Sequence, residues 1–129
     1  MTIAVDFDGT IVEHRYPKIG REKPFAIQSL QQLQRDGHRL ILFTSREGDL
    51  LEEAVQFCHE RGLDFYAINS NEPENALFPR RTAKVIADIY IDDRNLGGLP
   101  DWDEIYRIIG QKRLERQRRR KVRSWFHRR

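Results

Sequence analysis

Cysteine and long apolar runs are the two features that this sequence has least of. Its single cysteine, Cys58, has no partner in the chain for a disulfide, and its place in an apolar helix face predicts a core residue. The longest apolar runs, such as Leu40–Phe43, fall far short of the roughly 20 residues that span a bilayer, and no apolar signal segment is visible at the N-terminus. These absences argue against thiol chemistry and against a membrane partner, and they predict a cytoplasmic protein.

A clustered arrangement of histidines is also lacking. The four histidines are scattered, without the spacing that a zinc site or a catalytic triad would need; they are His14, His38, His59 and His127. Structural or solvent-facing roles are expected for them.

Charge is plentiful but unevenly distributed. The 129 residues, 39% of them hydrophobic, suffice for one compact core and not for two enzymatic domains. Residues 112–129 hold ten Lys and Arg against one acid, whereas residues 1–111 hold 13 basic and 19 acidic residues. We therefore predict a domain over 1–111 with a net charge of −6, followed by a basic C-terminal extension over 112–129 with a net charge of +9.

Short apolar runs alternate with segments of helical periodicity. Four runs predict strands: Ile3–Phe7, Arg39–Phe43, Phe65–Ile68 and Ile89–Ile91. The predicted helices are 24–36, capped by Gly37, then Glu47–Arg61, Arg80–Ala87, and a last helix that begins at Asp101 with Glu104 in capping-box position. Strands that are apolar on both faces and alternate with helices indicate a parallel sheet with helices on each side, whose ligands bind beyond the carboxyl ends of the strands.

Acidic side chains follow two of these strands. Asp6 and Asp8 alternate with Phe7, so the two carboxylates project to one side while the phenylalanine packs to the other. Asp92 and Asp93 follow the fourth strand. Neighbouring carboxylates repel one another unless a cation neutralises them, and a hard divalent ion such as Mg²⁺ is suited to oxygen ligands. With a metal bound, one aspartate can attack phosphorus and a second can protonate the leaving oxygen and later activate water.

Hydrogen-bond donors for a phosphoryl group are also present. Thr44 follows the second strand and Lys84 precedes the fourth, and both can compensate the charge on phosphate oxygens. Thr44 has the alternative role of capping the next helix, which is equally open to Ser45, and Lys84 that of a solvated helix residue. Asn69 and Ser70 end the third strand at the same edge, although both residue types are common in loops.

The order of these motifs resembles that of the haloacid dehalogenase superfamily of hydrolases. The matching segments lie within positions 3 to 110 and are Asp-x-Asp-Gly-Thr at 6–10, an apolar run with threonine at 40–44, Lys84, and Ile-Asp-Asp at 91–93. The resemblance implies a three-layer α/β/α Rossmann-like domain with a mainly parallel sheet. It also implies a Mg²⁺-dependent phosphatase that works through a phosphoaspartate on a phosphorylated substrate.

The resemblance assigns a role to each motif residue. It implies Asp6 as the nucleophile, Asp8 as the general acid/base, and Thr44 and Lys84 as phosphate ligands. The implied metal ligands are Asp6, Asp8 through its backbone carbonyl, Asp92 and Asp93, with Asp93 the more direct of the last two.

Two arginines flank these motifs. Thr-Ser-Arg-Glu-Gly at 44–48 and Asp-Asp-Arg at 92–94 are similar to segments of the phosphatase domain of polynucleotide kinase/phosphatases, which implies that Arg46 and Arg94 bind substrate. The arginine fork suits bidentate binding of phosphate, while ion pairs with nearby acids are the alternative. A nucleic-acid end that carries a 3′-phosphate is therefore the alternative substrate.

Room for a substrate-selecting cap is limited. Many members of this superfamily insert a cap after the first motif or after the third strand. Here Ile11–Lys23 suffices for a hairpin-like flap, and Asn71–Pro79 for a loop. By resemblance the chain is a capless member, whose open site is closed by the substrate or by another subunit.

Other functions remain open at this point. A phospho-accepting receiver domain also uses aspartates, Mg²⁺, Thr and Lys, but no aspartate follows Phe65–Ile68, where its acceptor would lie. Residues 112–129 bind nucleic acid, with Trp125 and Phe126 available for stacking, or form a solvated helix, or dock on the acidic body of a second copy and make an oligomer. The motifs leave the physiological substrate open, small molecule or macromolecule.

Overall fold

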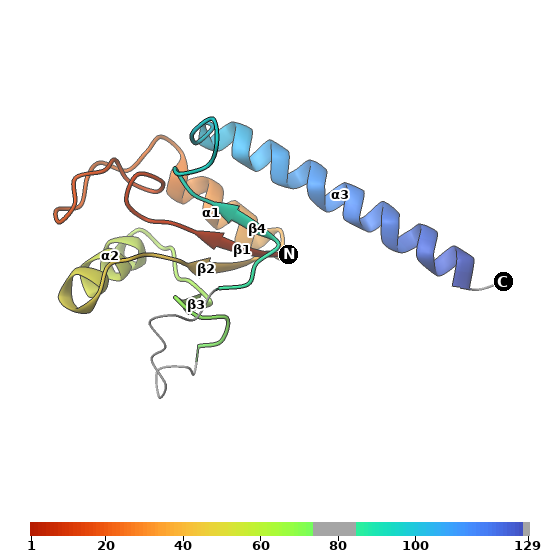
Figure 1. Cartoon of the computed structure of the whole chain (residues 1–129), viewed down its shortest axis with the longest axis horizontal. Helices are drawn as coiled ribbons and strands as arrows, with labels where there is room; N and C mark the ends of the chain where they lie inside the picture. Colours follow the sequence, from red (N-terminus) through yellow and green to blue (C-terminus); the bar gives the residue numbers. More distant parts are fainter. Residues whose placement is uncertain (74–84, 128–129) are drawn as a thin grey trace.

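The computed structural model describes residues 1–73 and 85–127. Strands and helices alternate in the order β1 (Thr2–Val5), α1 (Ala26–Arg35), β2 (Arg39–Leu42), α2 (Gly48–Glu60), β3 (Ala67–Ile68), β4 (Ile89–Ile91) and α3 (Trp102–His127). The four strands form one sheet in the order β3-β2-β1-β4, and every neighbouring pair is parallel. The predicted α/β fold with a parallel sheet is confirmed (Figure 1).

The two faces of the sheet are covered differently. Alternate residues of β1 and β2 point to one face, where they share a core cluster with buried residues of α1, α2 and α3; among them are Ile3, Val5, Leu40, Leu42, Leu30, Cys58 and Ile105. The other face holds a smaller cluster of Ala4, Ile41, Ala67 and Val85. All three described helices therefore contribute to one face. The helix expected at Arg80–Ala87 falls mainly outside the described residues, and its last three positions, 85–87, are not helical.

The predicted helix at Glu47–Arg61 matches α2 to within one residue at each end. Its inward face is narrower than the sequence suggested, because only Ala54 and Cys58 are fully buried. Burial raises the pKa of the Cys58 thiol to about 12. The interpretation of Cys58 as a core residue is confirmed.

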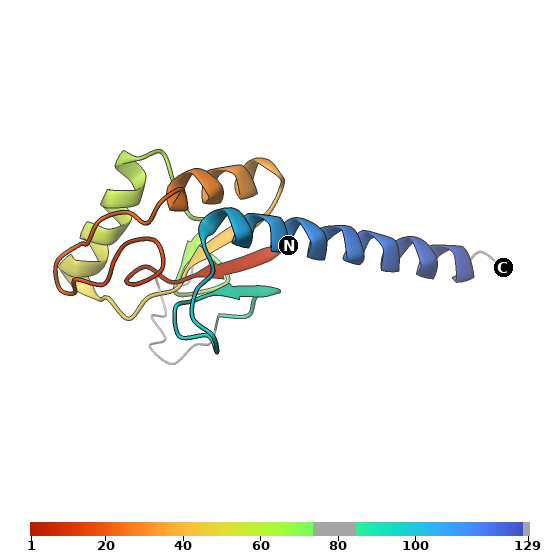
Figure 2. The same ribbon diagram turned by 90° about the horizontal axis from the view of Figure 1, so that it is seen from above.

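Helix α3 is the longest element and changes character along its length. Its first turns bury Trp102, Ile105 and Ile109, because they pack against α1 and the sheet. From position 111 onward every described residue is exposed, and the helix projects far beyond the rest of the molecule (Figures 1 and 2). The helix therefore runs unbroken across the predicted boundary between 111 and 112.

The start of α3 differs from the expected capping box. Glu104 forms an ion pair with Arg107, one turn further along the helix, and the backbone N–H of Ile105 donates to the carbonyl of Asp101 at 2.9 Å.

None of the described helices is long and apolar enough to cross a membrane.

Candidate active site

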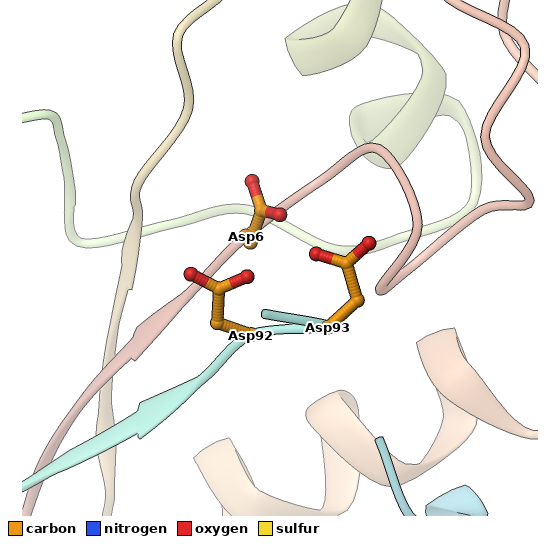
Figure 3. A group of neighbouring side chains, drawn as sticks. All are labelled: Asp6, Asp92 and Asp93. Carbon is orange, nitrogen blue, oxygen red and sulfur yellow. The ribbon is translucent and has the colours of Figure 1, made fainter. Parts of the chain in front are cut away.

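Three carboxylates meet at the carboxyl ends of β1 and β4. These strands are neighbours with Val5 opposite Ile91, and the pairing continues into Asp6, whose N–H donates to the carbonyl of Ile91 at 3.0 Å. Asp6 therefore lies beside Asp92 and Asp93, and carboxylate oxygens of all three lie within 4.8 Å of one another. Figure 3 shows the three side chains extending from the two strand ends toward a common space.

This clustering changes the acidity of Asp6. Burial raises its pKa to about 7, a hydrogen bond from the backbone of Phe7 opposes the rise, and the charges of Asp92, Asp93 and Asp8 add to it. The donor set suits Mg²⁺, which prefers oxygen ligands at about 2.0–2.1 Å, so that two ligands on opposite sides of the ion lie about 4.2 Å apart. The observed limit of 4.8 Å is within a small side-chain movement of that spacing.

The turn after β1 holds Asp93 against the first motif. Gly9 has φ +81°, and a Cβ atom there would lie 2.2 Å from Oδ2 of Asp93, so only glycine fits. Thr10 is fully buried; its Oγ1 accepts the N–H of Asp93 at 3.2 Å, and its carbonyl accepts the indole N–H of Trp102 at 3.0 Å. The Gly-Thr of the motif therefore joins the turn after β1, the loop after β4 and the start of α3.

Asp8 and Arg46 form a bidentate ion pair. The Nε and Nη2 atoms of Arg46 donate to the two carboxylate oxygens of Asp8 at 2.7 and 2.8 Å. The Arg46 side chain is 0% exposed and that of Asp8 is 13% exposed. The hydrogen bond to Asp8 is the main reason that the pKa of Arg46 is raised. The guanidinium that the sequence assigned to substrate phosphate is thus engaged by a carboxylate of its own chain, which was the alternative interpretation.

The remaining N–H groups of Arg46 donate to backbone carbonyls of the 11–23 segment and of α2. They bind the carbonyls of Pro17, Lys18 and Leu50 at 3.2, 3.0 and 3.4 Å. The guanidinium carbon also lies 5.3 Å from the ring centre of Phe7 and 5.2 Å from that of Tyr16. Sequence reasoning missed Tyr16 and these carbonyls, because backbone acceptors in a loop leave no signal in residue types.

Residues 11–23 form the flap that the sequence predicted. The N–H of Glu13 donates to the carbonyl of Arg21 at 2.7 Å, and the N–H of Lys23 donates to the carbonyl of Ile11 at 2.8 Å. These bonds pair the two arms of a hairpin beside Asp8. Its tip is the loop that Arg46 binds, so Arg46 connects the flap, Asp8 and α2.

Thr44 lies at the carboxyl end of β2, in contact with the end of β3. Its N–H donates to Oδ1 of Asn69 at 2.8 Å, and its Oγ1 accepts the N–H of Arg46 at 3.1 Å. The N-cap residue of α2 is Glu47, without a side-chain capping bond. The alternative that Thr44 or Ser45 caps this helix is therefore wrong. Asn69, with φ 53°, orients the Thr44 backbone.

The other predicted site residues lie at the rim or outside the described residues. Arg94 is exposed, and its backbone N–H donates to Oδ1 of Asp92 at 3.0 Å. The hydroxyl of Ser70 donates to the carbonyl of Glu72 at 2.6 Å, so it supports the loop after β3. Lys84 and most of the window 71–79 lie outside the described residues.

The chain was compared with known proteins. No family model and no curated protein matches it at a significant level. Among solved structures it is similar to the conserved protein coded by a locus from Bacteroides thetaiotaomicron, with a TM-score of 0.80 and 59% identity over 87% of this chain and 91% of that one. Identity at this level over most of both chains accompanies a shared fold, and the chain belongs to the same family as this conserved Bacteroides thetaiotaomicron protein.

Proposed function

We propose that this protein is a phosphomonoester hydrolase of the haloacid dehalogenase type, which works with Mg²⁺ through a phosphoaspartate on Asp6. The observation that carries the proposal is the group of Asp6, Asp92 and Asp93 at adjacent strand ends, with Asp8 oriented two residues from Asp6 by Arg46. An isolated acidic group has many explanations. A nucleophile, an oriented second carboxylate and a threonine that follows the neighbouring strand together match the requirements of phosphoryl transfer.

Mg²⁺ would be held by the carboxylates of Asp6, Asp92 and Asp93 and by the backbone carbonyl of Asp8. That carbonyl accepts no hydrogen bond from any described residue, so it remains available as a ligand. The ion would neutralise the clustered charges and compensate the charge on the phosphoryl oxygens. The superfamily's three-layer architecture is part of the same proposal.

In the first half of the reaction, a carboxylate oxygen of Asp6 attacks phosphorus while the bond from phosphorus to the ester oxygen breaks. The alcohol oxygen leaves with a proton, and we assign the Asp8 carboxyl as its donor. Asp6 must be ionised to attack, and metal binding favours that form over the protonated form that burial stabilises.

In the second half, water attacks the phosphorus of the phosphoaspartate, and the Asp8 carboxylate accepts its proton. Phosphate leaves and Asp6 is restored. The bidentate ion pair with Arg46 fixes the position of the Asp8 carboxylate for this proton transfer. Arg46 is therefore a positioning residue, whereas Thr44, Lys84 and Arg94 remain the proposed phosphate ligands.

The test is release of phosphate from p-nitrophenyl phosphate, with Mg²⁺ and with chelator. We expect Mg²⁺-dependent turnover in the wild type, a loss of at least about 10³-fold in Asp6→Asn, and normal activity in the exposed control Asp103→Asn. In Asp8→Asn, radiolabelled phosphate should accumulate on the protein, because the second step lacks its base. Turnover that persists in Asp6→Asn contradicts the assignment of the nucleophile.

The substrate class is the part of the proposal with least support from the site. A panel of nucleotides, sugar phosphates, phosphopeptides and 3′-phosphorylated oligonucleotides separates the candidates by kcat/KM. A preference for the oligonucleotides would favour the alternative of a nucleic-acid-end phosphatase.

A further inference from the structure

The projecting half of α3, residues 111–127, makes almost no contact that explains its composition. All its described residues are exposed, and it extends past the amino ends of the strands, away from the carboxylates of the candidate active site (Figures 1 and 2). A solvent-surrounded helix needs favourable pairs along its own surface or an external partner.

The charges of this segment are nearly all of one sign. Between positions 111 and 127 there are eight Lys and Arg residues and one acidic residue, Glu115. One of them, Arg116, forms an ion pair of 3.0 Å with Asp88. Within residues 1–73 and 85–127, the side chains of the other seven make no hydrogen bond or ion pair; they are Lys112, Arg113, Arg118, Arg119, Arg120, Lys121 and Arg123.

Most of these cations lie on one side of the helix. At 3.6 residues per turn, six of the eight fall within about a third of the circumference, and we call them the basic stripe: Lys112, Arg113, Arg116, Arg119, Arg120 and Arg123. Like charges three or four positions apart destabilise a helix. A partner that carries a row of negative charges would relieve this repulsion along the stripe.

From this we infer that the projecting half of α3 binds the phosphodiester backbone of nucleic acid through the basic stripe. Eleven residue steps of about 1.5 Å give the stripe a length of roughly 16 Å, and a duplex carries one phosphate per roughly 3.4 Å of each strand. About five phosphates thus lie within its reach. The helix diameter of about 10–12 Å also matches the width of about 12 Å of the DNA major groove.

The opposite side of the helix favours this partner over a lipid surface. Three exposed apolar residues lie there, Leu114, Val122 and Trp125, and a fourth, Phe126, lies between them and Arg119 of the stripe. By helical spacing, Arg118 falls between Trp125 and Val122, and Glu115 falls between Val122 and Phe126. That sector is too interrupted for burial in a bilayer interface.

A second copy of the chain offers fewer negative charges than nucleic acid. The described body carries an exposed row of carboxylates on α2, formed by Asp49, Glu52, Glu53 and Glu60. These four charges would meet the six cations of the stripe, whereas a duplex presents phosphates on both of its strands along the same length.

The stripe continues the side of α3 that packs on the body through Ile105 and Ile109. Arg113, Arg116 and Arg120 line a cleft of about 300 Å³ together with Met1, Thr2 and Asp88. The bound strand would therefore lie in the angle between the projecting helix and the amino ends of β1 and β4. This position is remote from Asp6, so the inference does not depend on the proposed phosphatase activity.

The test measures binding of full-length protein to labelled 20-base-pair DNA, 20-base-pair RNA and a 20-nucleotide single strand by fluorescence anisotropy at 50 and 200 mM KCl. With five phosphates neutralised, duplex affinity should fall by about 500-fold between the two salt concentrations. The stripe variant K112Q/R113Q/R119Q/R120Q/R123Q should bind duplex at least about 100-fold more weakly at 50 mM KCl. Glutamine retains helix propensity, which circular dichroism verifies.

Two matched controls distinguish the stripe from charge alone. R113K/R119K/R120K/R123K keeps the charges and should bind within a few-fold of the wild type, and R118Q/K121Q removes two cations outside the stripe and should lose less than tenfold. The inference is overturned if the wild type binds none of the three probes at 50 mM KCl, or if the stripe variant binds as tightly as the wild type. Salt-sensitive dimerisation in light scattering, lost in the stripe variant, would assign the stripe to a second copy instead.

Discussion

The two ends of the sheet contain charged groups in contrasting states. At the carboxyl ends, Arg46 is fully buried and its donors bind Asp8, two loop carbonyls and one carbonyl of α2. Beyond the amino ends, the projecting half of α3 carries exposed cations of the same chemical type, and among the described residues of that half only Arg116 pairs with an acid. Arginine organises the chain itself in the first region, and in the second it is left for something outside.

The contrast shows that residue type alone does not identify a binding residue. Arg46 follows a motif threonine and has the position of a substrate ligand, yet its contacts make it a positioning residue. Arg119 and Arg123 follow no motif and have the position of ordinary solvated charges. Their side chains have no partner within the described chain, which leaves them available for an external one. The following predictions test this difference, from the largest expected effect to the smallest.

Replacing the buried arginine should have the largest effect on stability. Arg46→Met leaves Asp8 nearly buried without its counter-charge and should lower the free energy of unfolding by about 3 kcal/mol. Urea denaturation measures the loss. The matched exposed change, Arg119→Met, should leave the urea midpoint nearly unchanged; equal losses in the two variants would mean that burial does not distinguish the two regions.

Replacing Gly9, in the turn after β1, should have the second-largest effect on the free energy of unfolding. Gly9→Ala places a Cβ atom against Asp93 at a positive φ, and we expect a loss of about 2–3 kcal/mol together with weaker Mg²⁺-dependent activity. Gly97 has φ +88° with open space around it, so Gly97→Ala should lose only about 1 kcal/mol and keep its activity. Urea denaturation and phosphate release measure the two effects; an active Gly9→Ala would contradict the close approach of Asp93.

The pH dependence of stability should report the carboxylate group. Because the pKa of Asp6 is raised to about 7, the native state holds this proton more tightly than the unfolded chain. Stability without metal is therefore highest below about pH 4 as far as Asp6 is concerned, and it declines as pH rises to about 7. Allowing for solvent screening of a half-buried group, we expect the decline to be roughly 1–2 kcal/mol.

Thermal melts in chelator between pH 5 and pH 8 measure this decline. Asp6→Asn should remove the Asp6 contribution, and the variant should melt higher than the wild type at pH 8. Mg²⁺ should raise the wild-type melting temperature at pH 8 and have little effect on the variant. A wild type that is equally stable at both pH values, with or without Mg²⁺, would contradict the clustering of charge.

Removal of the projecting helix should have the smallest effect. A chain ending at Lys112 loses the exposed ion pair between Arg116 and Asp88, and its free energy of unfolding should change by less than about 1 kcal/mol. Its hydrolysis of p-nitrophenyl phosphate should equal that of the full chain. A large loss of stability or activity would show that the two regions are coupled.

Local sequence signals predicted much of the fold. Apolar runs and helical periodicity placed β1, β2, β4, α1 and α2 to within about two residues. The strands are apolar because they form the sheet inside the core, and the helices are periodic because each buries one side against the sheet. Strand β3 is shorter than predicted, with Ala67–Ile68 in place of Phe65–Ile68, since only those two residues pair fully with β2. Periodicity wrongly extended the helix predicted at Arg80–Ala87 to positions 85–87, where Val85 and Ala87 pack on the sheet without forming a helix and Ile86 is exposed.

The sequence by itself determined that Asp6, Asp92 and Asp93 would lie at the carboxyl ends of strands, which share one edge of a parallel sheet. That they meet was decided by the strand order, which makes β1 and β4 neighbours. It also determined the excess of positive charge after residue 111, which is a matter of composition. Only the tertiary structure decided that Arg46 binds Asp8 and the flap, since these contacts join residues up to 38 positions apart and include backbone carbonyls. It also decided that most charges of α3 remain apart from the acidic body, with Arg116 alone paired to Asp88 among the described residues of the projecting half, because the helix continues straight past the last residue that the sheet and α1 can bury.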